Sequence, residues 1–152
     1  MTPQALADTH AAAFTLSRPW RAEEFRDLLD DRFAFIVGDA RCFALGRVVA
    51  GEAEVLTIAT HPDFQRQGLA RAVMTNWLTR AVDLGGETAF LEVAEDNAPA
   101  RALYGAFGFC QAGCRPGYYP RQTGTPVDAL VLSRPLPWES NPDSRTKRSK
   151  SG

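Results

Sequence analysis

The chain has 152 residues, 45% apolar and 23% charged, enough apolar material for one soluble domain with a single core. Residues 138–152 hold four basic and two acidic side chains, so the first 137 residues hold thirteen basic and sixteen acidic ones. This weakly acidic body argues against a nucleic-acid partner. Both lysines lie in the last fifteen residues, which excludes a catalytic lysine in the body.

The cysteines and the lengths of the apolar stretches indicate in which cellular compartment the protein works. The three cysteines, Cys42, Cys110 and Cys114, are odd in number and form no CxxC pair. We therefore expect reduced thiols rather than a disulfide framework or a zinc site. The chain does not begin with a basic stretch followed by an apolar run, and no apolar stretch reaches membrane length. These patterns predict a cytoplasmic protein with no metal and no membrane partner.

The first sixty residues predict two helices followed by three strands. Thr2 before Pro3 is typical of a helix start. Apolar residues at i, i+3 and i+4 spacing predict a second helix over residues 21–29. Runs rich in β-branched and aromatic residues, separated by tight turns at Gly38-Asp39 and Ala50-Gly51, predict an antiparallel meander. Its strands are expected at residues 33–39, 41–49 and 52–60.

The spacing of apolar residues then changes to a helical period. The residues that recur every three or four positions, and so predict one long amphipathic helix, are Leu69, Val73, Trp77, Ala81 and Leu84. The pair Gly85-Gly86 should end this helix. A strand is expected over 88–94, and then a helix that Asn97 caps and Gly108 ends. A final strand pair is expected at 109–119 and 126–133.

Together these elements predict the fold class and the domain limits. A strand, a helix and a further strand in the middle of the chain imply a parallel pair, with antiparallel hairpins on both sides. We expect an α/β protein with a mixed sheet and helices on both faces. Residues 1–137 should form one domain, and the polar, serine-rich, basic segment 138–152 should be disordered.

A glycine stands at the head of the long predicted helix, behind the polar residues Gln65, Arg66 and Gln67. The first N–H groups of a helix have no intrahelical partner and, with the helix dipole, form an anion site. Gly68 would let a ligand approach the backbone closely. The alternative is a helix start capped by polar residues. The segment lacks the GK[ST] of a P-loop and the three glycines of a dinucleotide fingerprint.

The pattern Gln65-x-x-Gly68-x-Ala70 resembles the (Gln/Arg)-x-x-Gly-x-(Gly/Ala) pyrophosphate loop of the GNAT acetyltransferases. The resemblance continues through the segments TIATHPDFQRQGLARAV, FLEVAEDNAPARALYGAFGF, GYYP and DALVL, over roughly residues 14–132. Within that superfamily these segments are similar to the ribosomal-protein-alanine N-acetyltransferases, the RimI type. The resemblance implies the GNAT fold, in which the strand before the loop splays from its parallel neighbour and acetyl-CoA lies in the gap.

The resemblance also implies where acetyl-CoA, the acetyl donor, would bind. Backbone groups of Ile58, Ala59 and Thr60 would contact the pantetheine arm, and Asn97 would contact the same region of the donor. Main-chain N–H groups of the loop and helix start would hold the pyrophosphate. The residues of that loop are Arg66, Gln67, Gly68, Leu69, Ala70 and Arg71.

Acetyl transfer to an amine needs a neutral amine, a stabilised oxyanion and a proton for the leaving thiol. Alternation along 88–94 places Glu92 on the same face as Phe90 and Ala94. The residues alone leave open a solvated glutamate at a strand end and, for Tyr104, a core tyrosine. The resemblance implies that Glu92 is the base, acting through water, and that Tyr104 is the acid that protonates the CoA sulfur.

The identity of the acceptor rests on the same resemblance. It implies a protein N-terminus, the N-terminal alanine of a small-subunit ribosomal protein, with Tyr118 and Tyr119 beside the acceptor groove. Ordinary strand aromatics are the alternative for these two residues. An acetyltransferase acting on lysine side chains or a small amine stays open, as does a non-catalytic acyl-CoA-binding module. Glu92 together with Tyr104 disfavours the module, since binding needs neither. The sequence does not predict the oligomeric state.

Overall fold

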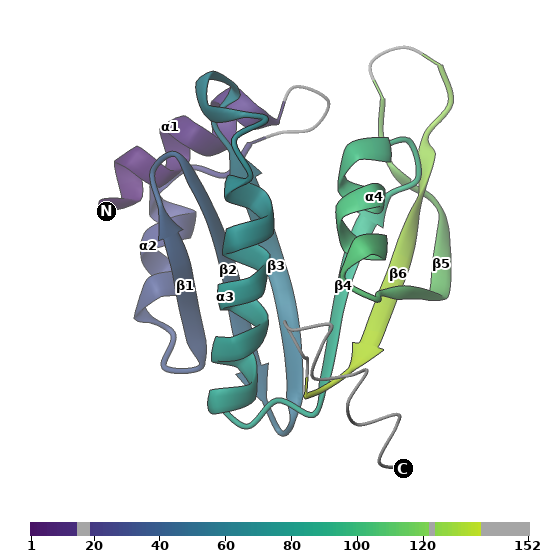
Figure 1. Ribbon diagram of the computed structural model, residues 1–152. Coiled ribbons are helices and arrows are strands. Elements are labelled where there is room, and N and C mark those ends of the chain that lie inside the picture. The colour runs from purple at the N-terminus through teal and green to yellow at the C-terminus, as the bar shows by residue number, and fades with distance from the viewer. Residues whose placement is uncertain (15–18, 122–123, 138–152) are drawn as a thin grey trace.

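The computed structural model describes residues 1–14, 19–121 and 124–137, so the predicted disordered tail lies outside the described residues (Figure 1). The elements run in the order α1 (Pro3–Ala13), α2 (Ala22–Asp30), β1 (Ala34–Asp39), β2 (Cys42–Val49), β3 (Glu52–Thr60), η1 (Pro62–Phe64), α3 (Leu69–Asp83), β4 (Thr88–Ala94), α4 (Ala98–Ala106), β5 (Cys110–Tyr119) and β6 (Val127–Pro135). None of the helices in these ranges is both long and apolar enough to cross a membrane.

One sheet organises the fold, with the strand order β1-β2-β3-β4-β6-β5. Among the described strands, only β3 and β4 pair in parallel, while the other neighbours are antiparallel. Helix α3 lies on one face of the sheet and α1 and α2 lie on the other (Figure 1). The predicted mixed α/β sheet with helices on both faces is therefore confirmed.

The two predicted helix caps are present. Thr2 Oγ1 accepts the N–H of Ala5 at 3.0 Å, and Asn97 Oδ1 accepts the N–H of Ala100 at 3.2 Å. Each bond satisfies one of the first N–H groups of its helix, which have no intrahelical acceptor. The sequence therefore located the starts of α1 and α4 correctly.

The hairpin turns follow local backbone chemistry. Ala50-Gly51 connects β2 to β3, as predicted, and both residues have positive φ, which suits the twist of a two-residue hairpin. The first turn was predicted wrongly at Gly38-Asp39. Asp39 pairs with Cys42, so the turn consists of Ala40-Arg41. The reason is that Asp39 Oδ1 accepts the N–H of Arg41 at 2.9 Å, which starts a turn at the aspartate itself.

The buried face of α3 agrees with the predicted stripe at Val73, Trp77 and Ala81 and differs from it elsewhere. Its buried residues are Val73, Met74, Trp77, Leu78 and Ala81, so Met74 and Leu78 add to the predicted stripe, while Leu69 is partly buried. Leu84 was predicted on this stripe, but it is 41% exposed. It lies beyond the last helical residue, at the C-cap, where the helical period no longer directs its side chain toward the sheet.

A bulge in β3 changes which side chains face which helix. Consecutive residues of β2 pair with Val55 and Thr57, so Leu56 has no partner in the ladder. Before the bulge, Val55 packs in the cluster beneath α3. After it, Ala59 packs in the cluster beneath α1 and α2, while Ile58 contacts the α3 cluster. The extra residue therefore resets the alternation just before the end of β3.

A close contact between β2 and α3 leads to a stability prediction. A Cβ at Gly46 would lie 2.4 Å from Nε1 of Trp77, whose side chain is fully buried. We expect Gly46→Ala to lower the free energy of unfolding by about 1–3 kcal/mol, because a well-packed core resists added volume. Gly113→Ala is the control, since a Cβ in β5 would meet Val131 at an ordinary 3.7 Å. Urea unfolding measures both, and equal stability of the two variants would contradict the prediction.

Candidate active site

The parallel strands β3 and β4 pair only near their starts. The ladder joins Glu52, Ala53 and Glu54 of β3 to residues 88–90 of β4 and then stops. Both strands continue beyond it, β3 to Thr60 and β4 to Ala94, and they diverge in space (Figure 1). This separation agrees with the splayed parallel pair that the resemblance implies.

The backbone of β3 points polar groups into this separation. The N–H of His61 donates to the carbonyl of Arg41 at 2.8 Å, which fixes the antiparallel pattern between β2 and β3 at this end. Because the direction of the backbone groups alternates along a strand, the N–H and C=O groups of Ile58 and Thr60 point away from β2, toward β4. Those of Ala59 bond within the sheet. Of the three predicted contact residues, two therefore present backbone groups at the open edge.

The loop before α3 has the backbone shape of an anion site. Arg66 and Gly68 both have positive φ, 64° and 77°, and no side chain caps the helix. The first helical bond runs from the N–H of Ala72 to Gly68, at 3.2 Å. The N–H groups of residues 69–71 therefore have no acceptor among the described residues. A Cβ at Gly68 would meet nothing within 4 Å, so the approach to these groups is open.

Glu92 lies within β4, where it pairs with Val131 of β6, and not at a solvated strand end. Its neighbours Leu91 and Val93 are buried in the cluster beneath α3. Glu92 therefore projects from the opposite face of the sheet, and its side chain is 27% exposed. Its Oε1 lies 3.2 Å from Nη2 of Arg115, which comes from β5. The carboxylate is held in place and is still open to a ligand.

Tyr104 is enclosed on the other side of β4. Its side chain is 5% exposed, and its ring packs edge-on against Phe109 at a centroid distance of 5.9 Å. Burial raises the pKa of Tyr104, and the phenol of Tyr119 adds to this effect. The hydroxyl therefore keeps its proton at neutral pH, as a general acid must before it acts.

Tyr118 and Tyr119 end β5, close to Glu92. Tyr119 is half-buried, and burial raises its pKa, with a further contribution from the Glu92 carboxylate. Tyr118 is 52% exposed, and the guanidinium of Arg115 lies 5.3 Å from its ring centre. The residues that meet on this face thus come from β4 and β5, which are not neighbouring strands.

The sequence missed Arg115 as a member of the site. The ladder between β5 and β6 is irregular between Arg115 and Tyr119, so strand alternation does not say which way either side chain points. The nearby Arg121 was also missed, and it binds Asp96 through two hydrogen bonds of 2.8 and 2.9 Å. No motif marks either arginine, and only their partners in space identify them.

Glu92 and Tyr104 do not share one face of the sheet. Tyr104 belongs to the cluster that contains Leu91 and Val93, whereas Glu92 points the other way. A molecule that contacts both must therefore lie at the open edge of β4, where β3 has separated from it. Asn97 starts α4 at the end of this edge, and its side-chain oxygen is already engaged in the helix cap.

The potential metal ligands and the cysteines that the structure describes lie in residues 1–14, 19–121 and 124–137. Within these ranges no group of three or more His, Cys, Asp or Glu side chains is arranged to hold a metal ion. The three cysteines are free thiols, with Cys42 buried and Cys110 and Cys114 exposed. The side chains and backbone groups described above offer the candidate site a carboxylate, phenols, guanidinium groups and backbone N–H groups.

Comparisons with known proteins agree with this geometry. Residues 5–109 match the model of a family described as Acetyltransferase (GNAT) family. The chain is 36% identical over 122 residues to the [ribosomal protein bS18]-alanine N-acetyltransferase of Escherichia coli K12, covering 78% of this chain and 82% of that relative.

Solved structures give the same picture. The crystal structure of the Escherichia coli ribosomal-protein-S18-alanine N-acetyltransferase is 30% identical, with a TM-score of 0.79 over 92% of this chain and 91% of that one. Arabidopsis thaliana NAA60, solved in complex with acetyl-CoA, has a TM-score of 0.73 at 14% identity, covering 88% of this chain and 93% of that one. The second likeness concerns the fold alone.

Proposed function

The chain belongs to the GNAT acetyltransferase family, in its ribosomal-protein-alanine N-acetyltransferase branch, and on this premise we propose that it acetylates the N-terminal alanine of a small-subunit ribosomal protein. It is an N-acetyltransferase, and the proposal concerns the acceptor, the donor site and the mechanism. The observation that supports this acceptor is the 36% identity over most of the length of a relative that is named for that substrate. A ribosomal acceptor also leads us to expect a cytoplasmic enzyme without a nucleic-acid or membrane partner.

Acetyl-CoA is the proposed donor, and the backbone fits its chemistry. The pyrophosphate would accept hydrogen bonds from the N–H groups at the start of α3, beginning at Gly68. The pantetheine arm carries amides, which would pair with the outward backbone groups of Ile58 and Thr60 at the open edge of β3. The amide nitrogen of Asn97 would contact the same arm. No metal is part of this proposal.

Gly68 offers a direct test of the donor site. We expect Gly68→Ala to weaken acetyl-CoA binding about tenfold, or ~1.4 kcal/mol, because a methyl group would stand over the N–H groups that hold the pyrophosphate. Gly85→Ala is a matched control at the other end of α3, since it also has positive φ and open space around a Cβ. Both changes should cost about 1–2 kcal/mol in stability through the left-handed conformation. Isothermal titration measures the acetyl-CoA affinity of both variants. Equal affinities would contradict the proposed pyrophosphate site.

The proposed reaction is direct attack of the acceptor amine on the thioester carbonyl. An α-amine has a pKa of ~8 against ~10.4 for lysine, so it loses its proton more readily near neutral pH. Glu92, whose carboxylate is held in place by Arg115, would take that proton through a water molecule. An outward N–H of β3, at Ile58 or Thr60, would stabilise the oxyanion. The C–S bond would then break, and Tyr104 would protonate the departing sulfur.

The acceptor would approach from the Glu92 face of the sheet. Tyr118 and Tyr119 would flank the acetylated terminal residue there. Tyr119 is close enough to the Glu92 carboxylate to be affected by its charge, and the Tyr118 ring lies beside Arg115. A donor at the open edge and an acceptor on this face would bring the amine and the thioester together between β3 and β4.

One experiment tests the proposed acceptor. The protein is incubated with acetyl-CoA and a set of peptides with varied N-terminal residues and internal lysines, and mass spectrometry locates the acetyl group. We expect acetylation of the α-amine, with alanine-first peptides preferred. Labelling of lysine side chains alone would favour the lysine acetyltransferase alternative. Binding of acetyl-CoA without turnover on any peptide or small amine would favour a non-catalytic module.

A further inference from the structure

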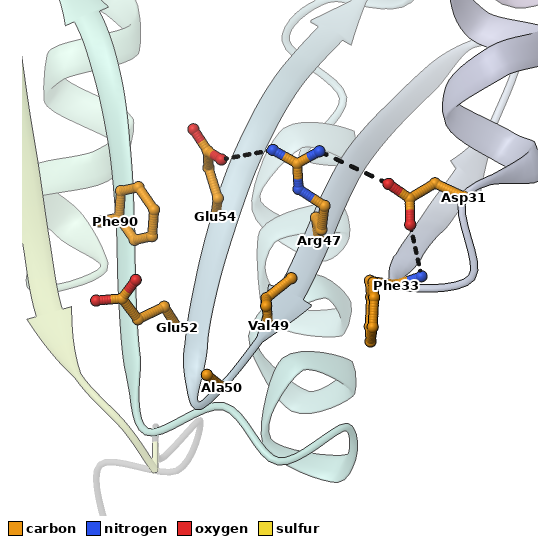
Figure 2. A pocket seen from close by; sticks show the side chains of 8 residues that line it. All are labelled: Asp31, Phe33, Arg47, Val49, Ala50, Glu52, Glu54 and Phe90. Carbon is orange, nitrogen blue, oxygen red and sulfur yellow. Dashed lines mark hydrogen bonds and ion pairs between the residues drawn. The ribbon is translucent and has the colours of Figure 1, made fainter.

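A hollow of about 400 Å³ lies at the end of the sheet that carries the turn between β2 and β3 (Figure 2). We refer to it as the acidic hollow. Its side chains come from the segment between α2 and β1 and from strands β2, β3 and β4. The residues that line it are Asp31, Phe33, Arg47, Val49, Ala50, Glu52, Glu54 and Phe90.

The acidic hollow and Glu92 share one face of the sheet. On β4, Phe90 and Glu92 flank Leu91, which packs in the cluster beneath α3. On β3, Glu52 and Glu54 flank Ala53, which packs in the same cluster. Figure 2 accordingly shows the side chains in front of the strands with α3 behind them. The surface therefore runs without a change of face from the proposed base into the hollow.

The charge of the acidic hollow is unbalanced. Three carboxylates line it against one guanidinium, Arg47, which already pairs with Asp31 at 3.7 Å and with Glu54 at 3.5 Å. Glu52 is exposed, and its side chain has no ion pair or hydrogen bond among the described residues. The lining therefore has a net charge of −2 and one carboxylate open to a cation.

Apolar groups complete the acidic hollow. Phe33 is 41% exposed and Val49 is 43% exposed, and Phe90 forms a further half-buried wall. The guanidinium of Arg32 lies 4.5 Å from the centre of the Phe33 ring, so one face of this ring already holds a cation and its remaining surface is apolar. A surface with both features suits arginine and lysine, whose apolar stems pack while their charged ends pair.

We propose that the acidic hollow docks a basic side chain of the acceptor protein, downstream of the amine that is acetylated. This inference rests on the proposed function and extends it to acceptor selection. Ribosomal proteins bind RNA phosphates through lysine and arginine, so a positively charged acceptor matches the charge of this surface.

The distance along the sheet sets the position of that side chain. Glu52 pairs with Thr88, which lies four residues before Glu92 on β4. At ~3.3 Å per residue this separation is about 13 Å, which an extended acceptor covers in about four residues. The lysine or arginine that contacts Glu52 therefore lies about four to six residues after the acetylated terminus.

Acceptor kinetics with Glu52→Lys test this inference. Two alanine-first acceptors are compared, a tripeptide and a ten-residue peptide with arginines at positions five and six. We expect the variant to raise KM about tenfold for the long peptide, equal to ~1.4 kcal/mol, and to leave kcat and the tripeptide KM unchanged. Asp83→Lys is the control, because it makes the same change of charge on an exposed residue at the end of α3. It should alter neither KM.

A charge exchange completes the design. A long peptide with glutamates in place of the two arginines should be a poorer substrate of the unsubstituted protein and a better one of Glu52→Lys. Should that variant fold poorly, Glu52→Gln gives the same test with a smaller charge change. An unchanged KM for the long basic peptide in both variants would overturn the docking proposal, as would an equal rise for the tripeptide. If the unsubstituted protein acetylates neither alanine peptide, the proposed function itself fails, which is a distinct result.

Discussion

Replacing Tyr104 with phenylalanine is expected to lower kcat about a hundredfold, the usual scale for a lost general acid. The change removes only the hydroxyl, so the ring should keep its packing against Phe109 in the cluster beneath α3. The KM for acetyl-CoA should therefore stay within about twofold of its original value, since the loss is confined to the transition state. Steady-state kinetics with saturating acceptor measure both constants.

The pH dependence gives a second readout for Tyr104. Burial raises the pKa of Tyr104 above its ordinary value of about 10, so the phenol remains protonated throughout the range from pH 7 to about 10. The original enzyme should thus show no fall in kcat from ionisation of its acid within that range. An unchanged kcat in Tyr104→Phe, with an unchanged melting temperature, would remove Tyr104 from the mechanism.

Replacing Glu92 with glutamine is the second change with a large expected effect. An amide cannot accept the proton of the acceptor, so kcat/KM should fall about a hundredfold at pH 7. The deficit should shrink as the pH rises past ~8, where the α-amine is already neutral in solution and needs a base less. Measuring kcat/KM from pH 6.5 to 9.5 with an alanine-first peptide tests this directly.

Arg115 provides the control for Glu92. Arg115→Gln removes the 3.2 Å ion pair but keeps the carboxylate, so it separates orientation of the base from its chemistry. We expect kcat/KM of Arg115→Gln to fall less than that of Glu92→Gln. The ratio of its kcat/KM to that of the unsubstituted protein should be similar at every pH. A deficit of Glu92→Gln that is constant across the pH range would indicate that the glutamate orients the acceptor and does not remove its proton.

Local patterns in the sequence were sufficient for most of the elements. Side-chain caps and helix-ending glycines act within a few residues, so Thr2 and Asn97 marked helix starts correctly. Alternation and helical periodicity likewise predicted the strands and α3. The errors, at the first hairpin turn and at Leu84, fall at element ends. There a single side-chain hydrogen bond or the loss of helical geometry decides the conformation.

The loop before α3 shows how far a motif reaches. The sequence indicated that Gly68 leaves helix N–H groups uncovered, and the positive φ and open space at this residue agree. It did not indicate that Arg66 also has positive φ, because a non-glycine residue in that conformation depends on the surrounding loop. The roles of these residues toward acetyl-CoA stay predictions.

The sequence by itself determined the order of the elements, the family and the residue types available for acetyl transfer, because periodicity, capping and motif spacing are properties of neighbouring residues. Only the tertiary structure decided where β3 leaves β4, that the bulge at Leu56 changes faces, and that Arg115 meets Glu92. It also assembled the acidic hollow from four separate segments. These features depend on strand register between residues far apart in the chain, and register is set by the packing of the whole sheet between its helices.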